Sequence, residues 1–204
     1  MRLFLALFVP LRLSGEIGQA VEAARRQLPG ARWVARENLH LTLHFFGERS
    51  GDQLAALARL LTPVVAAVPR FQVRIERVGT FPERRPRVVW LGVGDAAEAG
   101  ALDALHARIR EALERRGEPT EARRFHPHVT LARCKAPWRA SDVQRIGEAL
   151  HPFEGVSWEV DGIDLVASRL SRSGPVYETM ARLPLAGERV VEPAAPDSDV
   201  SSPP

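Results

Sequence analysis

The chain has 204 residues, of which 45% are hydrophobic and 26% charged, a balance that is typical of one large globular domain and excludes wholesale disorder. Its longest apolar runs, residues 3–11 and 60–68, fall short of the roughly 20 residues that a helix needs to cross a bilayer. The formal net charge of +3 permits a polyanionic partner without requiring one.

Segments with the periodicity of strands and of helices alternate along the chain. In chain order the predicted elements are a strand at 3–9, a helix at 13–28, extended segments at 33–35 and 39–46, a helix at 54–65, strands at 71–78 and 88–93, a helix at 102–113, a strand at 128–134, a helix at 143–150, and strands at 156–168 and 176–183. The strand pairs without an intervening helix, around 71–93 and 156–183, indicate antiparallel pairing. We therefore expect an α+β fold rather than a parallel α/β fold.

The pattern His-x-Thr-x occurs twice, at residues 40–43 (HLTL) and 128–131 (HVTL). In a β-strand, side chains two residues apart share a face, so each copy places an imidazole beside a hydroxyl while the apolar residues enter the core. One copy would be the solvated side of a strand, but two copies in similar contexts indicate a functional site. The repeat predicts two pseudo-symmetric half-lobes that face each other across a groove.

Two facing pairs of histidine and threonine suit metal-independent acid–base catalysis. Histidine titrates nearest to neutral pH, so one imidazole can accept a proton while the other donates one. The threonine hydroxyls would donate hydrogen bonds to an anionic group held between the histidines. A phosphodiester fits this arrangement.

The sequence around both copies resembles the paired motifs of the 2H phosphoesterase superfamily. The matching stretches are residues 40–47 (HLTLHFFG) and 127–133 (PHVTLAR), with further similarity over 2–10, 87–93 and 165–177. Within that superfamily the chain most resembles the bacterial and archaeal RNA 2′,3′-cyclic phosphodiesterases, historically called 2′-5′ RNA ligases. The resemblance covers about residues 1–185.

This resemblance implies a bilobal α+β fold in which two antiparallel β-sheets line a central cleft and helices lie on the outside. It implies hydrolysis of a terminal 2′,3′-cyclic phosphate to a 2′-phosphate, with no metal and no other cofactor. By motif position, His40 would donate a proton to the departing 3′ oxygen, and His128 would accept one from water. Thr42 and Thr130 would hold the phosphate oxygens.

Arg133 follows the second motif at a position where the family places an arginine near the phosphate. Its planar guanidinium can bind a phosphate through two hydrogen bonds. Strict alternation from His128 would put Arg133 on the opposite face of the strand. Its assignment to substrate binding therefore requires a β-bulge or the end of the strand.

The same family is credited with the reverse reaction, which joins a 2′,3′-cyclic phosphate end to a 5′-hydroxyl end. The strained cyclic diester supplies the activation, so this ligation needs no ATP. The sequence agrees, because Lys135 is the only lysine among the 28 basic residues and fits neither a Walker loop nor a lysyl-adenylate site.

Two further histidines lie near the motifs. By alternation, His44 shares the face of His40, and His126 shares the face of His128, so four imidazoles could form a zinc site. A catalytic zinc site also needs carboxylates that orient its ligands, and few flank the motifs. We therefore expect no metal and assign His44 to substrate binding.

Aromatic residues near the motifs could stack on a base. Phe125 is the expected stacking residue because of its location beside the second motif. Phe45, Phe46 and Trp90 belong to apolar strands and are expected in the core. The arginine-rich loop 84–87 is expected to be a solvated hairpin, with contact to an RNA backbone as the alternative.

The domain is predicted to span residues 1–186. From Gly187 onward the chain is rich in proline, aspartate and serine and poor in apolar residues, so 187–204 is expected to be a disordered tail. Cys134 is the only cysteine, which excludes an internal disulfide and favours a reduced, cytoplasmic protein. No membrane association is expected, and a monomer is the simplest assumption.

The predicted partner is an RNA that ends in a 2′,3′-cyclic phosphate, such as a tRNA fragment. Two alternatives remain open from the sequence. The substrate could be a small cyclic nucleotide-derived phosphate, or the protein could be a nucleotide-binding module without turnover.

Overall fold

The computed structural model of the protein describes residues 1–28, 30–97, 100–171 and 174–185. The elements of these residues are β1 (Arg2–Phe8), α1 (Leu11–Ala20), α2 (Glu22–Gln27), β2 (Ala31–Trp33), η1 (Arg36–Asn38), β3 (His40–Glu48), α3 (Gly51–Ala66), β4 (Phe71–Phe81), β5 (Val88–Asp95), α4 (Ala101–Glu114), β6 (His128–Cys134), α5 (Ala140–Leu150), η2 (His151–Phe153), β7 (Ser157–Val160), β8 (Gly162–Ser171) and β9 (Gly174–Pro184). The expected tail at 187–204 lies outside the described residues. No helix in the described part of the chain combines the length and apolar character that crossing a membrane requires.

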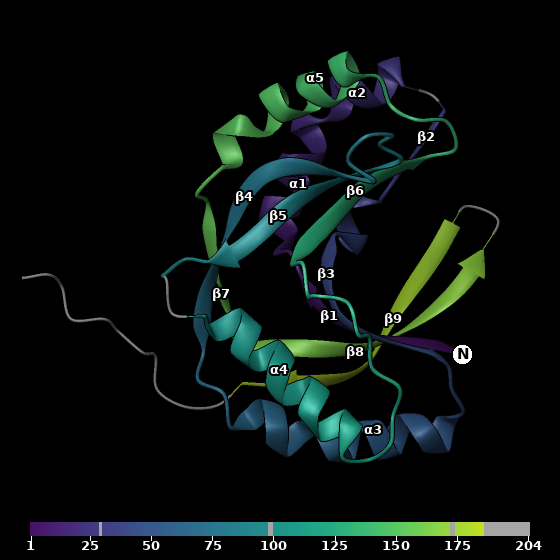
Figure 1. Ribbon diagram of the computed structural model, residues 1–204, viewed down its shortest axis with the longest axis vertical. Helices are drawn as coiled ribbons and strands as arrows, with labels where there is room; N and C mark the ends of the chain where they lie inside the picture. Colours follow the sequence, from purple (N-terminus) through teal and green to yellow (C-terminus); the bar gives the residue numbers. More distant parts are fainter. Residues whose placement is uncertain (29, 98–99, 172–173, 186–204) are drawn as a thin grey trace, which may run out of the picture.

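The strands form one antiparallel sheet, which confirms the α+β prediction (Figure 1). The strand order is β7-β4-β5-β6-β3-β1-β8-β9, with β2 beside β6. The two expected sheets are thus the two halves of a single sheet, which meet between β3 and β6 at the residue pair Leu41–Val129. Each half contributes one copy of the His-x-Thr-x motif to this seam.

The sheet curls so that its two ends approach each other. Strand β7 ends at Val160 and β8 begins at Gly162, although the two strands belong to opposite halves of the sheet. The single strand predicted over 156–168 is therefore wrong, because Asp161 carries the chain from one half to the other. At Gly162 a Cβ would lie 2.8 Å from the carbonyl oxygen of Leu183, so a glycine is needed for this close approach.

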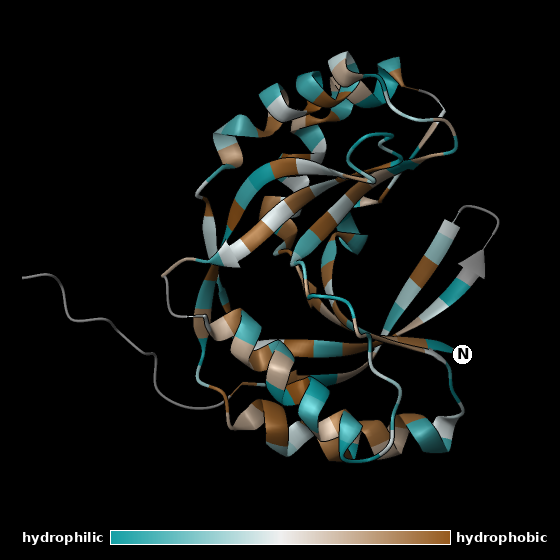
Figure 2. Ribbon diagram, in the orientation of Figure 1, coloured by the Kyte–Doolittle hydropathy of each residue, from teal (hydrophilic) through white to brown (hydrophobic). Residues whose placement is uncertain are grey.

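Helices cover one face of the sheet and build the main core (Figures 1 and 2). Helices α1, α2 and α5 lie over one half, and α3 and α4 lie over the other. The single helix predicted over 13–28 is two helices, α1 and α2, that meet at Val21. The main core combines apolar helix residues with alternate residues of the strands, including Leu3, Leu5 and Leu7 of β1.

A smaller cluster lies on the opposite face of the sheet. It consists of Phe4, Ala6 and Val166, with Phe8 and Tyr177 packed against it. Strand β1 is thus buried on both faces, which explains why its sequence is apolar almost throughout rather than alternating.

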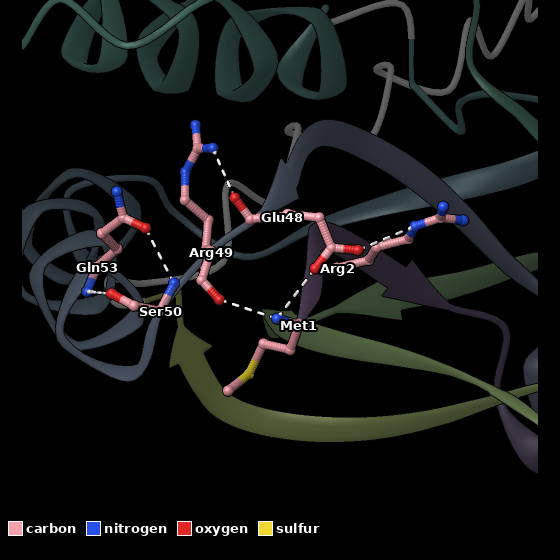
Figure 3. Close-up of polar contacts among 6 residues, drawn as sticks. All are labelled: Met1, Arg2, Glu48, Arg49, Ser50 and Gln53. Carbon is pink, nitrogen blue, oxygen red and sulfur yellow. Dashed lines mark hydrogen bonds and ion pairs between the residues drawn. The ribbon is translucent and has the colours of Figure 1, made fainter.

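Polar contacts fix the register of β1 against the far end of β3 (Figure 3). The amino group of Met1 lies 3.1 Å from a carboxylate oxygen of Glu48 and donates to the carbonyl oxygen of Arg49 at 3.0 Å. Directly afterwards, α3 begins with a capping box. The Ser50 hydroxyl accepts a hydrogen bond from the backbone N–H of Gln53, and the Gln53 side-chain oxygen accepts one from the backbone N–H of Ser50. These contacts hold the end of β3 and the start of α3 in place.

Gly79 on β4 pairs with Trp90 on β5, and the indole lies across the glycine. A Cβ at residue 79 would lie 2.1 Å from a ring carbon of Trp90. We expect Gly79→Ala to displace the indole and lower the free energy of unfolding by about 1–3 kcal/mol in urea denaturation. Gly147→Ala in α5 is the matched control, because a Cβ at this position would meet nothing within 4 Å. This substitution should stabilise the helix by about 0.5–1 kcal/mol. Equal effects of the two substitutions would contradict the packing argument.

Candidate active site

The two motif strands bring both histidines and both threonines to one face of the sheet. Leu41 on β3 pairs with Val129 on β6, and both side chains are buried in the main core. Continuing this antiparallel register by one residue in each direction sets His40 beside Thr130 and Thr42 beside His128. A local two-fold axis through the pair therefore relates the two motifs. We call the side of the sheet that carries these four residues the histidine face.

Both imidazoles are held in the same way. The Nδ1 atom of His40 lies 2.6 Å from the carbonyl oxygen of Asn38, and that of His128 lies 2.7 Å from the carbonyl oxygen of His126. A carbonyl oxygen can only accept, so each Nδ1 carries a proton and donates it. Each Nε2 is left to exchange a proton with another molecule.

Aromatic rings surround each motif histidine on the histidine face. The rings of Phe4, Phe8 and Tyr177 lie 5.1, 5.6 and 5.3 Å from that of His40. The rings of Phe81, Trp90 and His126 lie 5.2, 5.8 and 6.1 Å from that of His128. These rings come from strands β1, β4, β5 and β9 and from the segment before β6. They remove both imidazoles from much of the solvent.

Burial is the main reason why the pKa values of both histidines lie below 6.5. The nearby charge of Arg133 lowers the pKa of each further, and His128 adds to this effect on His40. Both imidazoles are thus mainly neutral at pH 7. A bound anion on the histidine face would raise both pKa values and favour protonation of one of them.

Arg133 reaches the histidine face through a β-bulge in β6. Trp90 of β5 pairs with Thr130 and Val89 pairs with Ala132, so one additional residue, Leu131, lies between the paired positions. Leu131 and Ala132 are both buried, and Arg133 returns to the histidine face with an exposed side chain. Its effect on the pKa values of both histidines agrees with this position. Of the two arrangements that the assignment of Arg133 required, a bulge or the end of the strand, the structure contains the bulge.

An equivalent bulge in β3 removes His44 from the histidine face. Ala6 of β1 pairs with Thr42 and Leu5 pairs with His44, so Leu43 is the additional residue. His44 is 8% exposed and lies opposite Leu5 in the main core. Its ring lies 4.7 Å from that of Phe46. The prediction that His44 shares the face of His40 and binds substrate there is therefore wrong.

The four-imidazole arrangement is consequently not formed. Within the described ranges there is no group of three or more histidine, cysteine, aspartate or glutamate side chains placed to hold a metal ion. The three remaining imidazoles, those of His40, His126 and His128, belong to the aromatic surroundings described above.

One face of the Phe125 ring packs against α4 and not against the motif histidines. Its ring stacks on that of His106 in α4, with a centroid distance of 3.9 Å and an interplanar angle of 3°. Phe125 and His126 also line a pocket of about 610 Å³ between β5 and α4. One face of the Phe125 ring is thus occupied, and its role in stacking on a base stays a prediction.

Other aromatic residues of the histidine face were not recognised in the sequence. Phe45 is 52% exposed, because the β3 bulge turns it outward beside Phe4, and by motif position it is the equivalent of Arg133. Trp90 lies beside Thr130, and Tyr177 lies edge-on to His40. The first two were expected in the core, and the only signal for Tyr177 was the resemblance over 165–177. Phe46 is buried, as predicted.

Comparison with known proteins agrees with this arrangement. Residues 13–172 match the family model described as the 2′-5′ RNA ligase superfamily. The chain belongs to this superfamily. The RNA 2′,3′-cyclic phosphodiesterase of Aeropyrum pernix is 37% identical over 148 residues, which are 72% of this chain and 82% of that protein. The enzyme of the same name from Thermus thermophilus is 34% identical over 95% of both chains.

Solved structures of this superfamily share the fold. A crystal structure of a Thermus thermophilus protein has a TM-score of 0.75 and 30% identity, and covers 93% of this chain and 100% of its own. LigT of Escherichia coli, complexed with 3′-AMP, has a TM-score of 0.68 and 29% identity over 91% of this chain and 98% of its own. In the present chain, both motif strands, β3 and β6, lie within residues 13–172, which the family model matches.

The burial of His44 predicts a pH dependence of stability. Burial holds its pKa below the value of 6.5 that it has in the unfolded chain. The unfolded state therefore takes up this proton first, and the free energy of unfolding falls as the pH decreases below 6.5. We expect His44→Leu to reduce this loss, as measured by urea denaturation at pH 7.5 and pH 5. The same stability difference between variant and wild type at both pH values would contradict a buried, neutral His44.

The position of Arg133 makes a second prediction. Its positive charge contributes to the low pKa values of His40 and His128. In Arg133→Gln both pKa values should rise, which NMR titration of the imidazole resonances measures directly. Arg59→Gln, an equal change of charge on the exposed side of α3, is the control and should leave both values unchanged. If neither pKa rises in Arg133→Gln, the guanidinium does not lie near the two imidazoles.

Proposed function

We propose that the protein hydrolyses the 2′,3′-cyclic phosphate at the end of an RNA to a 2′-phosphate. The observation that carries this proposal is the pair of equivalent imidazoles, each with Nδ1 bound to a backbone carbonyl and Nε2 free for proton transfer. Several relatives that bear the name RNA 2′,3′-cyclic phosphodiesterase, at 30–37% identity over most of this chain, support it.

The reaction uses both imidazoles in one step. In the proposal, the neutral Nε2 of His128 takes a proton from water, and the resulting oxygen attacks phosphorus. The bond from phosphorus to the 3′ oxygen breaks, and the protonated Nε2 of His40 donates its proton to that oxygen. The product carries a 2′-phosphate, and proton exchange with solvent restores both imidazoles. The local two-fold axis makes the two histidines equivalent, so the direction of transfer rests on the family resemblance.

The other polar groups stabilise the charge on phosphorus. The hydroxyls of Thr42 and Thr130 would donate hydrogen bonds to the non-bridging oxygens from opposite strands. The guanidinium of Arg133 would add a positive charge on the same face. Binding of the anionic phosphate would also raise the pKa of His40 and supply the protonated acid that the step needs.

The same arrangement would join two RNA ends when a 5′-hydroxyl of RNA is present. The 5′ oxygen would then attack phosphorus in place of water, and a 2′-5′ linkage would result. The strained cyclic diester provides the free energy, so no nucleotide cofactor takes part. We also propose that the protein acts as a monomer. A location in the cytoplasm is in keeping with its single cysteine.

The test is incubation of EDTA-treated protein with a short RNA that ends in a 2′,3′-cyclic phosphate, with 2′- and 3′-phosphate products resolved by chromatography. We expect the 2′-phosphate to form without added metal. His40→Ala and His128→Ala should each lower kcat by about 10²–10⁴-fold, the usual contribution of one acid–base group. Thr42→Ala and Thr130→Ala should have smaller effects.

His151→Ala is the control, because this exposed histidine lies in η2, between α5 and β7, and belongs to neither motif. Near-normal turnover in either His40→Ala or His128→Ala would exclude the two-histidine mechanism. Binding of nucleotide by the wild-type protein without any turnover would instead identify a recognition module.

A further inference from the structure

Two arginines lie directly opposite each other at the end of β6. Arg32 on β2 pairs with Arg133 on β6 in the antiparallel register, so the two side chains share one face of the sheet. The β6 bulge has already placed Arg133 on the histidine face, and Arg32 therefore lies on that face as well. Both side chains are exposed.

No carboxylate of the described residues neutralises this pair of positive charges. In the part of the chain that the structure describes, neither guanidinium forms an ion pair or a side-chain hydrogen bond with a carboxylate, whereas many other arginines do. Like charges opposite each other on neighbouring strands destabilise a sheet. An anion bound beside Arg32 would reduce this repulsion.

The position of Arg32 separates it from the reacting phosphate. Strand β2 pairs with residues 132–134, at the opposite end of β6 from His128. Arg133 is among the charges that lower the pKa values of both motif histidines, and Arg32 is not among them. The anion that Arg32 can bind is thus a second one, farther from the histidines than the phosphate that reacts.

We propose that Arg32 binds the phosphodiester that precedes the cyclic end of the RNA, so that the protein selects an RNA chain over a cyclic mononucleotide. This inference rests on the proposed function. A nucleoside 2′,3′-cyclic phosphate has only the reacting phosphate and cannot engage Arg32. Any RNA of two or more nucleotides has the second phosphate in the same molecule.

The positive surface continues beyond this pair. The backbone N–H of Cys134 donates to the carbonyl oxygen of Arg87 at 2.8 Å, and that of Trp138 donates to Pro86 at 2.7 Å. These bonds hold the loop that carries Arg84 and Arg85 against the end of β6. The exposed side chains of this loop add positive charge at this end of β6, and they would bind further phosphates of a longer RNA.

The test compares two substrates that differ by one nucleotide. A dinucleotide with a 2′,3′-cyclic phosphate end contains the second phosphate, and a nucleoside 2′,3′-cyclic phosphate does not. We expect Arg32→Gln to lower kcat/KM for the dinucleotide roughly tenfold, as for loss of a charge-assisted hydrogen bond, and to leave kcat/KM for the mononucleotide unchanged. Arg32→Lys should lower kcat/KM for the dinucleotide less than Arg32→Gln does. Arg59→Gln on α3 should have the same kcat/KM as the wild type with both substrates.

Affinity for the dinucleotide 3′-monophosphate and for the nucleoside 3′-monophosphate, measured by calorimetry, gives a readout that does not need turnover. Arg32→Gln should weaken binding of the dinucleotide alone and reduce its dependence on salt. An equal loss with both ligands, or no loss with either, would overturn the role of Arg32. A wild-type protein that binds but hydrolyses neither cyclic substrate would overturn the proposed function, while the binding comparison would still decide the role of Arg32.

Discussion

The backbone pair between Leu41 and Val129 is the constraint on which the site depends. It joins the two halves of the sheet at their seam, and its antiparallel geometry creates a local two-fold axis. A histidine before the pair and a threonine after it, on both strands, are therefore brought together by one contact. The carbonyl oxygens of Asn38 and His126 then fix the tautomer of each imidazole.

The residues near this pair could be placed by strand alternation alone, but those beyond the bulges could not. Alternation holds from each histidine to the threonine two residues later. A β-bulge then reverses the face of the residues that directly follow it, and where it forms depends on pairing with β1 or β5. The same shift brings Arg133 to the histidine face and takes His44 away from it. His44 therefore lies in the core and Phe45 at the surface, which is the opposite of what the polarity of the two side chains predicts.

Contacts between distant strands were also beyond the reach of local patterns. The periodicity identified most elements and the antiparallel character of the sheet, but it joined β7 and β8 into one strand. Both segments are apolar and extended, and only tertiary structure shows that the chain passes to the other half at Asp161. The rings around His40 come from β1, which lies next to β3 in the sheet, and from β9, from which the Tyr177 ring reaches His40. The low pKa of His40 is therefore a property of the fold and not of the motif.

The place of β1 in the sheet has a consequence for how the chain folds during synthesis. This strand leaves the ribosome before the other strands of the sheet, yet it pairs with β8 on one side and is buried on both faces. Until residues 162–171 emerge, its apolar edge has no partner other than β3. Strands β4, β5, β6 and β7 belong to the other half and can pair as soon as they are made. The half that contains His40 is thus completed last, and its unpaired edge is the surface of the nascent chain most exposed to aggregation.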